Sequence, residues 1–172
     1  MDVIWVELTH GLPDANQLAH LMVRLMAATL LGAVIGFQRE RAGKPAGLRT
    51  HILVALGTTV FVMAGSGAGM SSDGLSRVIQ GIITGIGFIG AGSILKLERE
   101  HDIQGLTTAA GIWMTAAIGV AVGLGSLGVA LLSTFLTLII LSLVGSFEHR
   151  IEEKLAAEST DSVKRASGRN KD

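Results

Sequence analysis

The chain has 172 residues, of which 49% are hydrophobic and 16% charged, and its mean hydropathy is +0.54. Soluble domains carry about 25% charged residues, so this composition favours a membrane protein over a soluble enzyme. The 14 basic and 14 acidic residues balance, which gives no net attraction to nucleic acid, and the lack of cysteine excludes disulfides and thiolate chemistry.

The first expected membrane-spanning helix covers residues 19–38 and follows an extracytoplasmic segment at 1–18. The charge-free stretch from Leu25 to Phe37 is too short to cross a hydrocarbon core of ~30 Å, so this helix takes Arg24 into the membrane. An ionisable residue within a span is a functional-site hypothesis by default. The alternative is that Arg24 extends back to the outer interface.

One face of this first helix carries residues spaced by four: Arg24, Ala28, Gly32, Gly36 and Glu40. This face carries small residues in its middle and a charged residue at each end. We therefore expect it to point into a helix bundle.

Four more spans are expected at 50–68, 77–96, 106–123 and 127–147, before a polar cytoplasmic tail at 149–172. Residues 106–147 contain no Asp, Glu, Lys or Arg, and as one helix they would be about 63 Å long. They must therefore turn back near the glycines at 123–128. The predicted fold class is an all-α integral membrane protein with five transmembrane helices.

Orientation follows from the basic residues. Twelve of the 14 Lys and Arg residues lie in the 1–2 connection, the 3–4 connection and the tail. Cytoplasmic segments carry an excess of Lys and Arg. The pattern predicts an outside N-terminus and a cytoplasmic C-terminus.

The 23 glycines suit a membrane interior, where small residues let helices approach closely. GxxxG pairs at 32/36, 81/85 and 119/123 favour helix packing within one chain or in a homo-oligomer. The glycine-rich third helix is expected to be central, either simply packed or lining a path for a small solute. The intramembrane candidates are Arg24, Arg77, Gln80, Gly85, Gly87, Gly90 and Gly92.

Two similar segments, at 47–50 and 105–108, open the second and fourth expected helices on the same side. Free N–H groups at helix N-termini, together with arginine, favour anions. The anion could be phosphate, a nucleotide, a lipid headgroup or an acidic protein patch, and the alternative is ordinary basic charge beside anionic lipid. Glu40 and Arg49 are expected to pair. The candidates on this side are Arg39, Glu40, Arg49, Thr50, Thr107 and Thr108.

Five short motifs resemble the MgtC/SapB family: GAVIGFQRER at 32–41, AGLRTH at 46–51, RVIQG at 77–81, GIGFIGAG at 85–92 and GLTTAA at 105–110. The resemblance covers roughly residues 20–145. It implies a multi-pass protein of the bacterial inner membrane, in a family associated with low magnesium, survival in host cells, and acid or phosphate stress. The chain is similar to the short SapB- or YhiD-like type, without a C-terminal ACT-like domain. Thr107 stands where virulence-factor members often have Asn, which argues against a specific virulence role.

Magnesium transport is the weaker functional reading, because Mg²⁺ prefers carboxylates and waters and the five expected spans contain no Asp or Glu. The histidines show no metal-ligand spacing, and neither Ser93 nor Ser133 has a nearby base, so no metal site, cofactor or catalytic residue is predicted. The leading hypothesis is a small regulator in the lipid bilayer that contacts another membrane protein during stress adaptation. The alternative is a transporter or channel for a small ion such as Mg²⁺.

Overall fold

The computed structural model describes residues 3, 14–96 and 103–143. The chain divides into two compact units, residues 1–134 and 135–172, and the packing below is that of the first. Most of the expected N-terminal segment and all of the expected tail at 149–172 lie outside the described residues.

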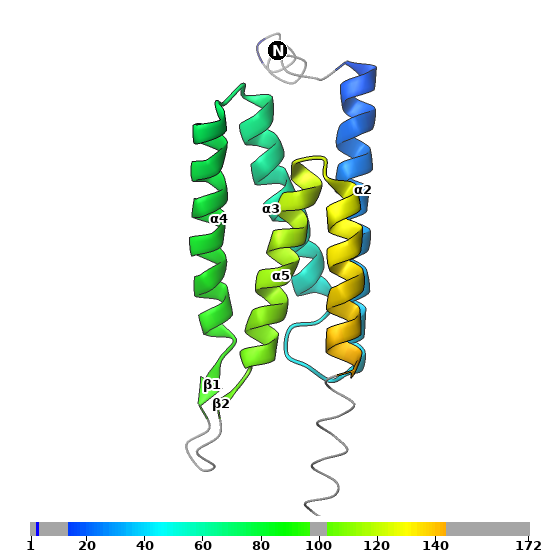
Figure 1. Ribbon diagram of the computed structural model, residues 1–172, viewed down its shortest axis with the longest axis vertical. Helices are drawn as coiled ribbons and strands as arrows, with labels where there is room; N and C mark the ends of the chain where they lie inside the picture. Colours follow the sequence, from blue (N-terminus) through cyan, green and yellow to red (C-terminus); the bar gives the residue numbers. More distant parts are fainter. Residues whose placement is uncertain (1–2, 4–13, 97–102, 144–172) are drawn as a thin grey trace, which may run out of the picture. The chain divides into compact units, whose positions relative to one another are not determined.

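Four long helices make up most of the first unit (Figure 1): α2 (Ala15–Arg41), α3 (Leu48–Gly67), α4 (Ser72–Gly92) and α5 (Leu106–Gly123). Each is long and apolar enough to cross a membrane. The next apolar helix is described over Leu127–Leu143, and this described part is shorter. The helical membrane class is therefore confirmed, while five spans and their orientation stay predictions.

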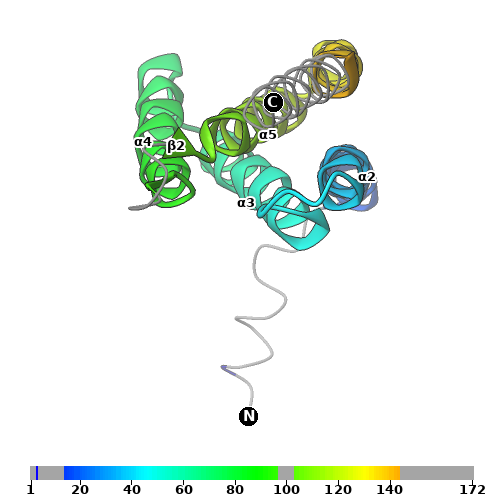
Figure 2. The same ribbon diagram turned by 90° about the horizontal axis from the view of Figure 1, so that it is seen from below.

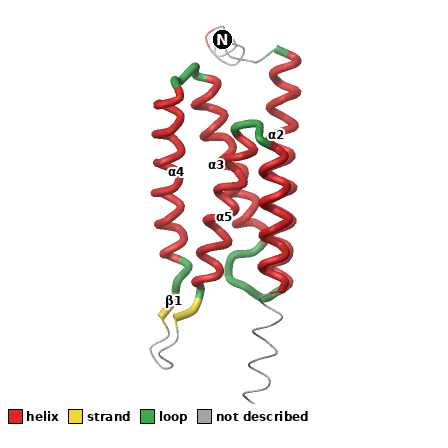
Figure 3. Tube along the Cα trace, viewed as in Figure 1, coloured by secondary structure: helices red, strands yellow, loops and turns green. Residues whose placement is uncertain are grey.

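The connection from α4 to α5 contains two strands that the all-α prediction did not include (Figure 3). They are β1 (Leu95–Lys96) and β2 (Ile103–Gln104), which pair antiparallel with Leu95 opposite Gln104. The expected third span therefore ends early, because the chain becomes extended after Gly92 instead of staying helical to residue 96.

Capping residues explain where the helices begin. Asp14 accepts a hydrogen bond from the Gln17 amide at 2.7 Å, so α2 starts four residues before the expected position. Ser71 accepts from the Gly74 amide at 3.3 Å, which starts α4 at Ser72 instead of residue 77. The bounds of α5 are those predicted.

Helix α3 packs against both α2 and α5, whereas α4 contacts α5 and α3. Within this unit α4 lies at one edge, on the side away from α2 (Figures 1 and 2). The prediction of a central third helix is wrong. Phe88 on α4 is 84% exposed, and a Cβ added at Gly81 or Gly85 would meet nothing within 4 Å.

The close packing instead uses glycines on α2 and α5. A Cβ added at Gly32 would lie 2.7 Å from the His51 carbonyl oxygen, and one at Gly119 would lie 2.6 Å from the Ala55 carbonyl oxygen. Such distances leave no room for a side chain, so the backbones of α2, α3 and α5 touch through small residues. The inward-facing stripe predicted for the first helix is confirmed in its middle, because Ala28, Gly32 and Gly36 are buried, whereas Arg24 is half-buried and Glu40 is exposed.

Candidate functional site

Polar side chains gather inside the bundle near one of its ends. We call this end, where α2 finishes and α3 and α5 begin, the rim (Figure 1). Four buried residues near it form the polar cluster: Arg39, His51, Thr108 and Thr115. They come from three helices, so the cluster exists only once α2, α3 and α5 have packed together.

Arg39 belongs to the last turn of α2 and is 3% exposed. One guanidinium nitrogen, Nη2, donates to the hydroxyl oxygen of Thr108 at 2.5 Å. The Nε atom of Arg39 is buried and has no hydrogen-bond partner in the described structure. The guanidinium is therefore held against the first turn of α5, and its Nε–H group remains able to donate another hydrogen bond.

His51, on α3, makes the second contact of the polar cluster with α5. Its Nδ1 lies 2.7 Å from the Thr115 hydroxyl oxygen, and that hydroxyl donates to the Gly111 carbonyl oxygen at 2.9 Å. This contact joins α3 to α5 whichever ring nitrogen of His51 carries the proton.

Glu40 caps a helix instead of forming the predicted pair with Arg49. Its carboxylate Oε2 accepts from the Leu48 amide at 2.9 Å. The residue at the helix start, Gly47, has no capping side chain, so Glu40 supplies from α2 the acceptor that α3 lacks. The described residues show no ion pair between Glu40 and Arg49, and the Glu40 carboxylate bonds to the start of α3.

The structure divides the six rim candidates into two groups. Arg39 and Thr108 are buried and bonded to each other. Glu40, Arg49 and Thr107 are exposed, and Thr50 is half-buried. The basic side chains Arg41 and Lys44 are also exposed at the rim, which makes its surface cationic over the described residues.

Arg24 has a structural partner far from the rim. Its Nη1 donates to the Gly123 carbonyl oxygen at 2.9 Å, at the last residue of α5. The guanidinium also fills the space beside Gly125, where an added Cβ would lie 2.6 Å from Nη2. A cation at a helix C-terminus is favourable, so Arg24 caps α5 from within the bundle and is not directed into lipid.

The α4 candidates lie away from Arg24 and from the polar cluster. Arg77, Gln80, Gly85, Gly87 and Gly92 are all exposed. Gly90 is buried and faces Ala109 on α5, with 3.6 Å from its added Cβ to the Ala109 Cβ. The structure thus does not bring the predicted intramembrane residues together.

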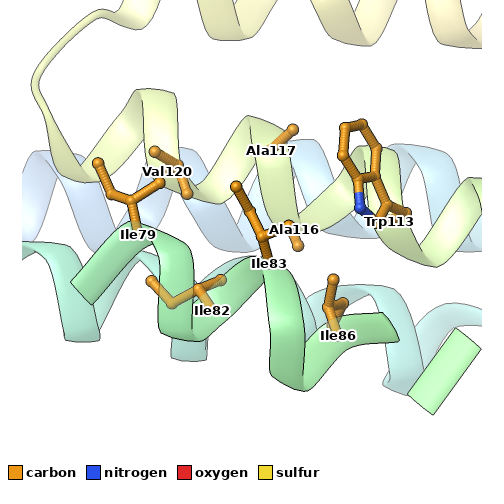
Figure 4. Close-up of a pocket in the computed structure, with 8 residues that line it drawn as sticks. All are labelled: Ile79, Ile82, Ile83, Ile86, Trp113, Ala116, Ala117 and Val120. Carbon is orange, nitrogen blue, oxygen red and sulfur yellow. The ribbon is translucent and has the colours of Figure 1, made fainter. Parts of the chain in front are cut away.

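An apolar groove runs between α4 and α5 (Figure 4). Its volume is about 140 Å³, and its lining includes Ile83, Ile86, Trp113 and Ala117. No charged or hydroxyl side chain contributes to this lining. Among the described residues, no three His, Cys, Asp or Glu side chains cluster in a way that could hold a metal ion.

Sequence reasoning missed His51 and Thr115 as members of the site. A signal was present, because His51, Ala55, Thr59 and Val62 recur at helical spacing and form the buried face of α3. Thr59 also donates from this face to the Gly119 carbonyl oxygen at 2.9 Å. Polar residues at core positions of an apolar helix indicate contacts between helices.

Residues 25–150 match the model of the MgtC family. The chain is 45% identical over 142 residues to SrpB of Synechococcus elongatus, covering 76% of this chain and 78% of SrpB. It is 40% identical over 143 residues to YhiD of Escherichia coli (strain K12), whose name associates it with magnesium transport, covering 79% of this chain and 66% of YhiD.

The protein MgtC of Salmonella typhimurium is 44% identical over 117 residues. That similarity covers 68% of this chain and 49% of the relative, so this chain corresponds to about half of that longer protein. No solved structure gives a significant match.

Proposed function

This chain belongs to the MgtC family, and we propose that it is a small non-enzymatic regulator of the bacterial inner membrane that contacts another membrane protein. The contact would help adaptation to stress such as low magnesium, acid or phosphate imbalance. The observation that carries the proposal is the exposed basic surface of the rim, formed by Arg41, Lys44 and Arg49. Such a surface suits an acidic patch on a partner.

Three polar side chains inside the bundle support this choice, since their hydrogen bonds join helices. Arg39 joins α2 to α5, His51 joins α3 to α5, and Arg24 joins α2 to the end of α5. The rim in addition presents exposed charged side chains that a protein partner could contact.

Transport of a small ion is the second candidate, favoured by the name of the relative YhiD. It would require a polar path through the membrane. The proposed lining residues Gln80, Gly85 and Gly87 lie instead on the open face of α4. The groove beside them is apolar, which disfavours an ion.

Charge reversal at the rim tests the regulator. We expect the double substitution Lys44→Glu with Arg49→Glu to abolish rescue of growth at low magnesium in a strain that lacks the chain. Arg77→Glu is the control for charge reversal, since Arg77 is an exposed arginine in the second turn of α4, at the opposite end of the bundle. Equal rescue by both variants, at equal membrane levels, would contradict the proposal.

Flux measurements separate the two candidates. Purified protein in proteoliposomes that enclose a Mg²⁺-sensitive dye should show no Mg²⁺ entry above that of empty vesicles. Selective Mg²⁺ entry that is lost in Arg24→Ala would support the transporter hypothesis and contradict the regulator hypothesis. Proteolytic accessibility of the reconstituted chain verifies insertion in either case.

A further inference from the structure

We propose that the N-terminus of α5, together with Arg39, binds a phosphate group, carried either by an anionic phospholipid headgroup or by a soluble phosphate. The proposal goes beyond the regulatory function and does not depend on it, because the purified protein alone is sufficient to test it. Three observations lead to it: the buried charge of Arg39, the open end of α5, and the absence of any acidic residue from the first turn of that helix.

Arg39 carries a positive charge that is removed from water and has no counter-charge among the described residues. The residue is 3% exposed, its Nη2 donates to the neutral Thr108 hydroxyl, and its Nε has no partner among the described residues. No carboxylate pairs with it among the described residues, since neighbouring Glu40 is exposed and bonded to the Leu48 amide. A buried unpaired charge is costly, so an external anion would stabilise this arrangement.

The start of α5 supplies free donors beside this charge. Gly105 precedes the helix with φ of 97° and offers no side chain, and the first bond that closes the helix runs from the Ala109 amide to the Gly105 carbonyl oxygen at 2.8 Å. The amides of Leu106, Thr107 and Thr108 therefore have no acceptor within the helix. Gly105 cannot be replaced easily, because a Cβ there would overlap the Ser93 carbonyl group.

The other three long helices have acceptors at this position. Asp14 caps α2, Ser71 caps α4, and Glu40 accepts from the first amide of α3. Among α2 to α5, the start of α5 is thus open to an outside acceptor. Arg39 already lies against its first turn through Thr108.

The donor set fits a phosphate group. Backbone amides at a helix N-terminus and an arginine guanidinium are favourable partners for phosphate oxygens. Thr107 adds an exposed hydroxyl in the same turn, and a hydroxyl can donate to a third oxygen.

The test is a thermal denaturation series on the protein in nanodiscs. In discs of phosphatidylcholine, inorganic phosphate is added at constant ionic strength with sodium chloride; in a second set, phosphatidylglycerol replaces part of the lipid. A Tm that rises saturably with inorganic phosphate identifies a soluble ligand. A Tm that rises only with phosphatidylglycerol identifies a lipid headgroup. A Tm unchanged in both sets overturns the proposal.

Two variants test whether a rise in Tm arises from binding at Arg39 and the start of α5. Arg39→Gln should raise the half-saturating concentration of phosphate or phosphatidylglycerol by about tenfold or more, whereas Arg49→Gln, at an exposed arginine of the same rim, should change it little. An equal loss of affinity in the two variants would mean that the basic residues of the rim attract phosphate without a specific site. That result would overturn the proposal.

A second pair keeps the test valid if Arg39→Gln does not fold. Thr107→Asp places a fixed carboxylate at the start of α5, so it should raise the basal Tm and remove the response to either phosphate source. The isosteric neutral variant Thr107→Asn should keep the response. A full response in Thr107→Asp contradicts the assigned position.

Discussion

Gly119 and Gly81 belong to the same kind of small-residue pair but have different surroundings. Gly119 faces α3 so closely that an added Cβ would lie 2.6 Å from the Ala55 carbonyl oxygen, whereas at Gly81 an added Cβ meets nothing within 4 Å. A GxxxG pattern alone cannot distinguish these cases, because spacing specifies a face of a helix and not what lies against it.

The two glycines should therefore respond oppositely to alanine. Gly119→Ala should lower the free energy of unfolding by about 1–3 kcal/mol, because the contact with the α3 backbone cannot open without moving a helix. Gly81→Ala should leave stability equal or slightly higher, since alanine favours helix by up to about 1 kcal/mol. Thermal denaturation of both variants in detergent measures the difference, and equal effects would contradict the assigned contacts.

At the scale of elements, α5 is held at both ends by side chains of α2. Arg24 donates to the Gly123 carbonyl oxygen at the C-terminus, and Arg39 donates to Thr108 in the first turn. The two arginines are 15 residues apart, or about 22 Å along a helix, so α2 spans most of the length of α5. This arrangement explains why a charged residue is retained within the first span.

Arg24→Ala should loosen the end of α5. Loss of a bond to a charged donor should destabilise the protein by about 1–2 kcal/mol, reduced here because Arg24 is only partly buried. Hydrogen exchange should accelerate at the Leu124 and Ser126 amides, which bond back to Val120 and Ala121. Arg77→Ala is the control, because Arg77 is exposed. Unchanged exchange at the end of α5 would rule out the cap.

At the scale of the whole molecule, the distribution of basic residues predicts which end of the bundle faces the cytoplasm. The exposed residues Arg41, Lys44 and Arg49 all lie at the rim. In the connection between α3 and α4, at the opposite end, residues 68–71 carry no charge. Under the positive-inside rule we expect the rim to face the cytoplasm.

Single-cysteine labelling tests this orientation cleanly, because the chain has no cysteine of its own. A membrane-impermeant maleimide should label Ser72→Cys in spheroplasts, whereas Lys44→Cys should react only after the membrane is permeabilised. Both positions are exposed, so accessibility in the folded bundle is matched. The reverse pattern would place the rim outside and contradict the cytoplasmic contact proposed for it.

Much of the membrane architecture was predictable from the sequence because the bilayer imposes strong local rules. A span requires about 20 apolar residues with every backbone group bonded internally, so the bounds of α5 and the buried stripe of Ala28, Gly32 and Gly36 agree with expectation. The rim was also identified as a cationic end with helix N-termini. The caps at Asp14 and Ser71 are local features that the hydropathy pattern did not reveal.

Only the tertiary structure decided which groups meet. Arg24 and Gly123 are 99 residues apart, and Arg39 and Thr108 are 69 apart. Their contacts depend on which faces of α2, α3 and α5 pack together. In a glycine-rich apolar sequence several faces of a helix carry equally small residues, so the sequence does not show which face packs. The sequence by itself determined that helices lie in lipid, because that depends on composition along one segment. Packing determined that α4 lies at an edge and that Arg39 is buried with no carboxylate partner among the described residues, because both depend on the positions of other helices.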